Sequence, residues 1–78
     1  MRNDVLKYPK VRDLRTDSDL SQTKVAEKLS IAQNTLSQYE TGKLNIPNEI
    51  LIQMALIYNT SVDYLLGLTN EKMPYPRK

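Results

Sequence analysis

Two short helical patterns stand side by side between residues 20 and 42, and they constrain the fold more than any other feature of the chain. In the first pattern, apolar residues recur at the three- and four-residue steps of one helix face: Leu20, Val25, Ala26 and Leu29. Ser21 stands at the start of this pattern, where its hydroxyl can accept a hydrogen bond from an unpaired backbone N–H group. The sequence therefore predicts a helix over residues 22–29.

The second pattern begins three residues later and predicts a helix over residues 33–41. Leu36 and Tyr39 are expected to face the interior, while polar side chains face outward: Gln33, Asn34, Ser37 and Gln38. Gly42 is expected to end this helix because glycine readily adopts the left-handed conformation. Two helices joined by a three-residue turn, the second presenting amide groups, are typical of a helix-turn-helix DNA reader.

Three further helices are predicted around this pair, so the chain is expected to be all-α with five helices. The first covers residues 10–17 and follows Pro9, whose missing N–H suits the first turn of a helix. The fourth covers residues 47–58, and a short fifth follows Ser61 and ends at Gly67. The sequence contains no strand-like alternation and no internal repeat.

One small domain, over residues 9–68, is expected from this pattern. Residues 1–8 carry no helical signal and are expected to form a flexible arm, and residues 69–78, which include two prolines, an irregular tail. The apolar stripe of the fourth helix is expected to lie in the core: Ile50, Leu51, Met54, Ala55 and Tyr58.

Composition excludes several classes of function. The 78 residues include no Cys and no His, so a disulfide, a thiolate metal site and the usual nucleophile–base pairs are absent. The acidic residues are scattered singly, so no metal or other cofactor is expected, and the chain is not expected to be an enzyme. The formal net charge of +2 permits contact with a polyanion without requiring it.

The sequence indicates neither a membrane-spanning segment nor an export signal. No apolar run approaches the roughly 20 residues that a membrane-spanning helix needs. The first ten residues, MRNDVLKYPK, lack the apolar core of a signal peptide. The expected location is therefore the cytoplasm.

The chain resembles the XRE family of helix-turn-helix regulators, whose members include the lambda-type phage repressors and Cro. The matching segments are VRDLR (11–15), LSQ (20–22), VAEKL (25–29), LSQYETGK (36–43), IPNEIL (46–51) and VDYLLG (62–67). They follow one another in order and without gaps over residues 10–68. The resemblance implies a lambda-repressor-like domain of five helices with its helix-turn-helix at residues 22–41, the third helix lying in the DNA major groove.

The resemblance also implies roles for individual residues. The side chains that contact base edges would be Gln33, Asn34, Ser37 and Gln38, and those that contact phosphates Gln22, Lys43 and Asn45. Independently of the resemblance, Gln and Asn present a donor and an acceptor together, which matches the N6 and N7 edge of adenine. On helix periodicity alone, however, the same amides could form an ordinary solvated face. An ion pair between Arg15 and Glu40 is expected to fix the angle of the third helix.

Two residues of the turn depart from the family pattern. Ser30 stands where members usually have Gly, and a left-handed conformation there would strain a non-glycine residue by roughly 1 kcal/mol. Ala32 stands where a polar cap is usual, and a missing cap typically costs about 1 kcal/mol. Neither departure changes the expected fold, and both bear on how rigid the turn is without DNA.

The function expected from these features is that of a sequence-specific transcriptional regulator of double-stranded DNA, in particular a repressor that binds without a small-molecule ligand. One short helix reads few base pairs, so a homodimer on a palindromic operator is expected, with half-sites roughly 34 Å apart. The alternative is a protein-interaction module, antitoxin-like or an accessory regulator, acting through the fourth and fifth helices. Ile52 and Leu56 could form an apolar patch for a dimer or another partner, beside Leu68 and Met73, or could be ordinary exposed residues.

Overall fold

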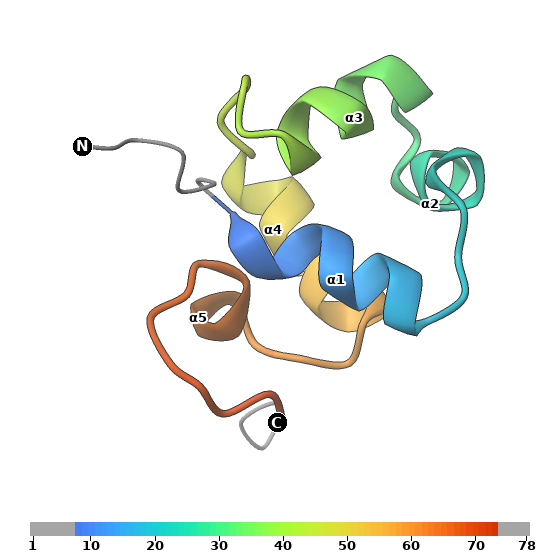
Figure 1. The fold of residues 1–78 in the computed structure, drawn as a ribbon. Helices are drawn as coiled ribbons and strands as arrows, with labels where there is room; N and C mark the ends of the chain where they lie inside the picture. Colours follow the sequence, from blue (N-terminus) through green and yellow to red (C-terminus); the bar gives the residue numbers. More distant parts are fainter. Residues whose placement is uncertain (1–7, 74–78) are drawn as a thin grey trace.

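The computed structural model describes residues 8–73, and all regular structure within them is helical (Figure 1). The helices are α1 (Pro9–Asp17), α2 (Gln22–Leu29), α3 (Gln33–Glu40), α4 (Asn48–Ile57) and α5 (Val62–Leu65). Five helices and no strand in this part of the chain confirm the predicted all-α fold. Residues 1–7 of the expected arm and residues 74–78 of the expected tail lie outside the described residues.

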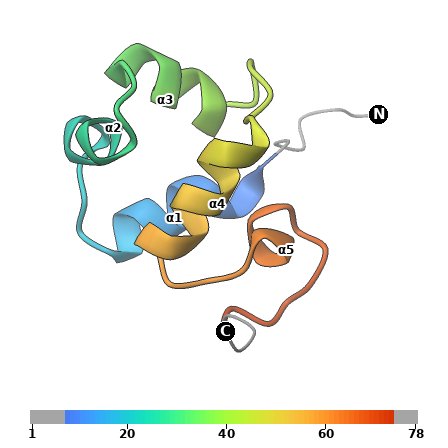
Figure 2. The ribbon, with the colours of Figure 1, turned by 180° about the vertical axis from the view of Figure 1, so that it is seen from behind.

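The helix-turn-helix pair lies at one end of the described domain. α2 packs against α3, while α1 contacts both α3 and α5, and α4 contacts both α2 and α5. Seen from either side, α2 and α3 stand on one side of the central helices α1 and α4, and α5 stands on the other (Figures 1 and 2). α3 thus packs against α1 and α2, and its outer face is left uncovered by the other helices.

All five helices contribute apolar side chains to one core. The positions that the helical patterns assigned to the interior of α2 and α3 are buried, Tyr39 among them, whereas Leu20 is half-buried. In α4, Ile50 is also only half-buried. The buried apolar residues of the helices are Val11, Leu14, Val25, Ala26, Leu29, Leu36, Tyr39, Leu51, Met54, Ala55 and Leu65.

Tyr8 corrects the expected extent of the N-terminal arm. Its ring is buried in the core, and its hydroxyl accepts a hydrogen bond from the backbone N–H of Ile46 at 2.9 Å. Ile46, in the segment between α3 and α4, is buried as well. Because the two residues are 38 positions apart, no local pattern could have placed Tyr8 in the domain.

Serine side chains begin two of the helices, as the sequence predicts. The Ser21 hydroxyl accepts from the backbone N–H of Lys24 at 3.1 Å, and the Ser61 hydroxyl accepts from that of Tyr64 at 3.1 Å. α3 and α4 begin without such a bond, because Ala32 and Pro47 have no side-chain acceptor. Each of the two serine caps satisfies one of the N–H groups that a helix start leaves unpaired.

Three non-glycine residues that follow helices have positive φ: Asp19 (58°), Ser30 (59°) and Asn59 (53°). Ser30 has ψ 41° and thus holds the left-handed conformation in the turn between α2 and α3. Gly42 (φ 82°) and Gly67 (φ 78°) have positive φ after α3 and α5, at the two positions where the sequence predicts helix ends.

Several predicted helix boundaries differ from the structure by one residue, and α1 begins at Pro9 instead of residue 10. α3 ends at Glu40, and Thr41, predicted as its last residue, is the C-cap with φ −90° and ψ −5°. α4 spans 48–57 instead of 47–58, because Pro47 is extended (ψ 152°) and only its carbonyl takes part, accepting from the N–H groups of Ile50 and Leu51. Differences of this size are usual at frayed helix ends.

The segment after α5 has no regular structure up to residue 73, and it returns to the α4–α5 connection. The buried Thr60 hydroxyl donates a hydrogen bond to the carbonyl of Lys72 at 2.5 Å. No helix of the described part is long and apolar enough to cross a membrane.

Candidate nucleic-acid interface

The four residues expected to read bases lie on one side of α3. Gln33 and Asn34 are exposed, and Ser37 and Gln38, one turn further along, are half-buried. Leu36, on the opposite side, is completely buried. Residues three and four positions apart are neighbours on a helix surface, so the pairs Gln33/Ser37 and Asn34/Gln38 form one outward surface.

This surface carries almost no charge. Glu40 is the only charged residue of α3, and it is buried against Arg15. The surface is therefore suited to hydrogen bonding through amide and hydroxyl groups, which can read base edges, more than to attracting phosphates.

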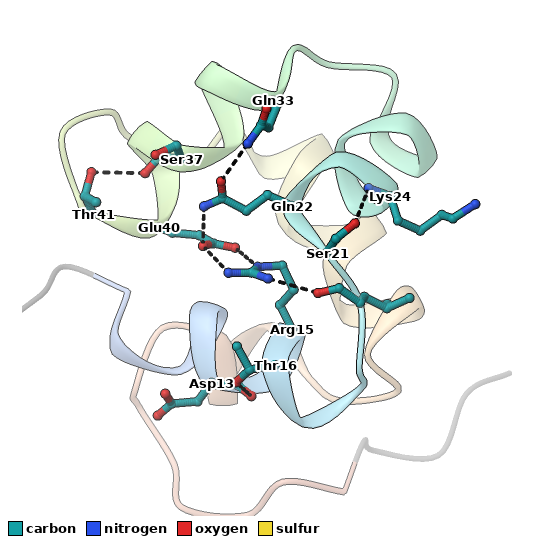
Figure 3. A network of polar contacts seen from close by, with 11 residues as sticks. Asp13, Arg15, Thr16, Ser21, Gln22, Lys24, Gln33, Ser37, Glu40 and Thr41 are labelled. Atoms are coloured by element: carbon teal, nitrogen blue, oxygen red, sulfur yellow. Dashed lines mark hydrogen bonds and ion pairs between the residues drawn. The ribbon is translucent and has the colours of Figure 1, made fainter.

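A chain of hydrogen bonds joins three helices beneath this surface (Figure 3). Arg15 of α1 donates to Glu40 of α3, with its Nε 2.6 Å from Oε2 and its Nη2 3.2 Å from Oε1. Gln22, the first residue of α2, donates from Nε2 to the same Oε1 at 3.0 Å. Gln33 then donates from its Nε2 to Oε1 of Gln22 at 3.1 Å. We call Arg15, Glu40, Gln22 and Gln33 the relay.

The ion pair at the inner end of the relay is shielded from solvent. The Glu40 side chain is 2% exposed and that of Arg15 11%. The hydrogen bond to Glu40 raises the pKa of Arg15, although burial acts in the opposite direction. Arg15 also donates from Nη1 to the carbonyl of Leu20 at 2.9 Å. The guanidinium thus ties the end of α3 to α1 and to the connection that leads into α2.

The hydroxyl of Tyr58, the residue directly after α4, is influenced by the charges of Glu40 and Arg15. Its side chain is buried, and its hydroxyl has no hydrogen-bond partner. Burial raises the pKa of Tyr58 to about 12, and the charge of Glu40 acts in the same direction. Helical spacing predicts the burial of this ring, but it gives no information on what surrounds the hydroxyl.

The residues expected to contact phosphates fall into two groups. Gln22 is half-buried, with its amide nitrogen and oxygen both engaged in the relay. Lys43 and Asn45 are exposed in the segment between α3 and α4. The backbone N–H of Lys43 donates to the carbonyl of Gln38 at 2.9 Å, which holds the start of this segment against the end of α3.

The charged face of α2 is a solvated surface. Lys24 and Glu27 lie 3.9 Å apart, with side chains 59% and 67% exposed. A pair of this kind typically contributes only a few tenths of a kcal/mol. Among residues 8–73, no group of carboxylates is arranged to hold a metal ion.

The expected apolar patch of α4 is solvent-exposed. Ile52 is 55% exposed and Leu56, one helical turn later, 58%. Leu68 and Met73, in the segment after α5, are exposed as well. On α4 the two side chains are a turn apart and so share a face, which is the geometry that a contact with another protein requires.

Known proteins share both the sequence pattern and the fold. The chain matches the family described as Helix-turn-helix over residues 11–65. It is 37% identical over 65 residues to the uncharacterized HTH-type transcriptional regulator YobD of Bacillus subtilis (strain 168), covering 83% of this chain and 58% of YobD. The HTH-type transcriptional regulator ImmR of the same organism is 36% identical over 58 residues, which are 74% of this chain and 46% of ImmR.

A repressor and a solved structure extend this comparison. The cryptic phage CTXphi transcriptional repressor RstR of Vibrio cholerae is 33% identical over 58 residues, which are 74% of this chain and 52% of RstR. A crystal structure of a transcriptional regulator from Listeria innocua superposes with a TM-score of 0.72 at 27% identity, covering 80% of this chain and 58% of that one. The chain thus spans about half the length of the curated relatives it matches. The matched segment and the shared arrangement of helices establish that this chain belongs to the helix-turn-helix family of the XRE type, a family of transcription regulators and not of enzymes.

Proposed function

We propose that this chain is a sequence-specific DNA-binding transcriptional regulator, in particular a repressor, and that α3 reads the major groove of double-stranded DNA. The observation that carries the proposal is the outward face of α3, where Gln33, Asn34, Ser37 and Gln38 share one side of a helix braced by a buried ion pair. Amides on such a helix can form paired hydrogen bonds with adenine. The relatives named as regulators, among them the repressor RstR, support the regulatory role.

Lys43 and Asn45 are proposed to hold the domain in register on the DNA backbone. Both are exposed in the segment that directly follows α3. A contact to phosphate fixes the orientation of the reading helix without discriminating between bases. Gln22 is proposed to contact a phosphate with the second hydrogen of its amide nitrogen, since one hydrogen already bonds to Glu40.

The operator is proposed to be palindromic and bound by two copies of the chain. α3 has eight residues, and a helix of this length contacts only a few base pairs. A second copy on the next turn of the duplex, roughly 34 Å away, would double the number of base contacts. Ile52 and Leu56 are the proposed contact between the copies, because they are exposed on one face of α4.

Selection of bound duplexes from a random DNA pool tests this proposal directly. We expect enrichment of an inverted repeat rich in A·T pairs, with half-sites about one helical turn apart. Recovery of sequences with no common motif would contradict sequence-specific reading. A single motif without a repeat would contradict the proposed dimer but not the reading role.

The alternative function, a protein-interaction module that acts through α4 and α5, is favoured by one observation, the exposure of Ile52 and Leu56. The salt dependence of binding separates the two functions. A protein that contacts phosphates loses DNA affinity as salt is raised, whereas an apolar protein interface is little affected. Failure to bind any duplex at low salt would favour the alternative.

A further inference from the structure

We propose that Glu40 determines which hydrogen-bonding groups Gln33 presents to the DNA, and that it is therefore a positioning residue for base recognition. This inference rests on the proposed function, since it concerns the same face of α3. The two residues do not touch in the relay: Gln22 stands between them and is bonded to both.

Glu40 orients the amide of Gln22. A carboxylate can only accept hydrogen bonds, whereas a glutamine amide has a donating and an accepting end. Glu40 therefore selects the orientation in which Nε2 of Gln22 faces Oε1 at 3.0 Å. The reverse orientation would set two acceptors against each other in a site where the carboxylate is 2% exposed.

The orientation of the Gln22 amide in turn fixes that of the Gln33 amide. With its nitrogen turned toward Glu40, Gln22 presents Oε1 to α3, and this oxygen accepts from Nε2 of Gln33 at 3.1 Å. One hydrogen of the Gln33 amide is thereby used. Its oxygen and its second hydrogen remain for a base, at an exposed position.

The groups that Gln33 leaves free for a base match adenine better than guanine. Adenine presents a donor (N6) beside an acceptor (N7), which matches one amide oxygen and one amide hydrogen. Guanine presents two acceptors, O6 and N7, so the oxygen of Gln33 would face an acceptor. An amide held by the relay should thus prefer adenine to guanine more strongly than one that is free to turn.

Arg15 holds the carboxylate of Glu40, the inner end of the relay, in place. Its two hydrogen bonds to Glu40, together with the bond to the Leu20 carbonyl, hold the carboxylate between α1 and α3. Glu40 consequently has two effects that an experiment must separate. One is structural and acts on every DNA sequence alike, and the other acts on the base pair read by Gln33 alone.

The test measures discrimination at single base pairs with purified full-length chain. Gln33→Ala first identifies the base pair at which the preference for A·T over G·C depends on Gln33. Glu40→Gln, which keeps the shape but removes the obligate acceptor, should then reduce that preference by roughly fivefold or more. Preferences at the other base pairs of the selected site should be unchanged.

A double-mutant cycle shows whether the effect passes through Gln22. Gln22→Ala removes the connection and should reduce the same preference by a similar factor. In the Gln22→Ala background, Glu40→Gln should have no further effect on this preference, although its effect on the free energy of unfolding should persist. Glu27→Gln, which removes an exposed carboxylate from α2, is the matched control and should leave base preference unchanged.

Two results would overturn the inference. In the first, Glu40→Gln weakens binding to all sequences by one common factor, which would make its role structural only. In the second, Gln22→Ala leaves the preference at the Gln33 base pair intact, a result that stays informative even if Glu40→Gln fails to fold. Absence of base preference in the wild-type chain would instead contradict the proposed function, so the two failures are distinguishable.

Discussion

Among the single residues of the core, Tyr58 is the one whose ionisation should make the stability of the domain depend on pH. Its hydroxyl is buried without a hydrogen-bond partner, and burial and the charge of Glu40 raise its pKa to about 12. The ordinary tyrosine pKa of about 10 applies in the unfolded chain. The fold therefore favours the neutral phenol over the phenolate.

Stability should consequently fall at alkaline pH. Between pH 10 and 12 the unfolded chain loses the Tyr58 proton first, so the contribution that is fully present below pH 10 decreases by about 1.4 kcal/mol per pH unit. Tyr58→Phe should remove this part of the pH dependence, and at neutral pH it should be neutral or slightly stabilising because an unpaired hydroxyl leaves the core. Urea unfolding of both proteins from pH 8 to 11 checks this. Parallel pH profiles would show that Tyr58 ionises equally in both states.

The residues proposed to contact DNA should separate into two kinds by their effect on specificity. Gln33→Ala and Gln38→Ala should each cost roughly 1–3 kcal/mol on the selected operator and leave binding to random DNA nearly unchanged. Lys43→Ala should weaken binding to all duplexes alike and lower the slope of log K against log salt by about one. Titrations of both duplexes at several salt concentrations test the two expectations together. Equal losses for a glutamine variant on specific and random DNA would remove it from the reading face.

At the scale of the helical elements, local signals predict much of the fold. Ser21 and Ser61 stand where they cap α2 and α5, and the apolar stripe predicts which face of α4 is buried. These features depend on residues within one or two turns of each other, so the sequence pattern contains them. The one-residue differences lie at helix ends, where a single torsion decides whether a residue counts as helical: Pro9, Thr41, Pro47 and Tyr58.

Contacts between elements are less predictable. Tyr8 joins the core through Ile46, and Gln22 joins Gln33 and Glu40 across two helices. No periodicity connects positions so far apart. The resemblance to the XRE family supplied the individual roles of Arg15, Glu40 and Gln22, but the continuous relay could be seen only in the structure.

Two substitutions in the turn between α2 and α3 should each stabilise the domain. Ser30 holds φ 59°, a conformation that glycine adopts without strain, so Ser30→Gly should stabilise the fold by up to roughly 1 kcal/mol. Ala32 begins α3 without a cap, so Ala32→Ser should add about 1 kcal/mol. Chemical denaturation of each variant provides the free energies. Clear destabilisation by Ser30→Gly would mean that the left-handed conformation carries no strain in this turn.

At the scale of the whole molecule, the face proposed to read DNA and the face proposed to bind a second copy are on different helices. The residues proposed to read bases lie on α3, whereas Ile52 and Leu56 lie on α4. A substitution on α4 should therefore change cooperativity without changing base preference. This separation makes the dimer independently testable.

Leu56→Asp should weaken cooperative binding to an inverted repeat while leaving the affinity for a single half-site within about twofold, since an exposed substitution away from the reading face changes little else. The physical reason is that a charge in an apolar contact must be desolvated without a partner. Gln53→Asp, an exposed neighbour on α4, is the control that introduces the same charge beside the patch. Gel-shift titrations of one-site and two-site duplexes measure both quantities. Full cooperativity in Leu56→Asp would place the contact between copies elsewhere on the molecule, because the buried carboxylate could not be accommodated at the proposed face.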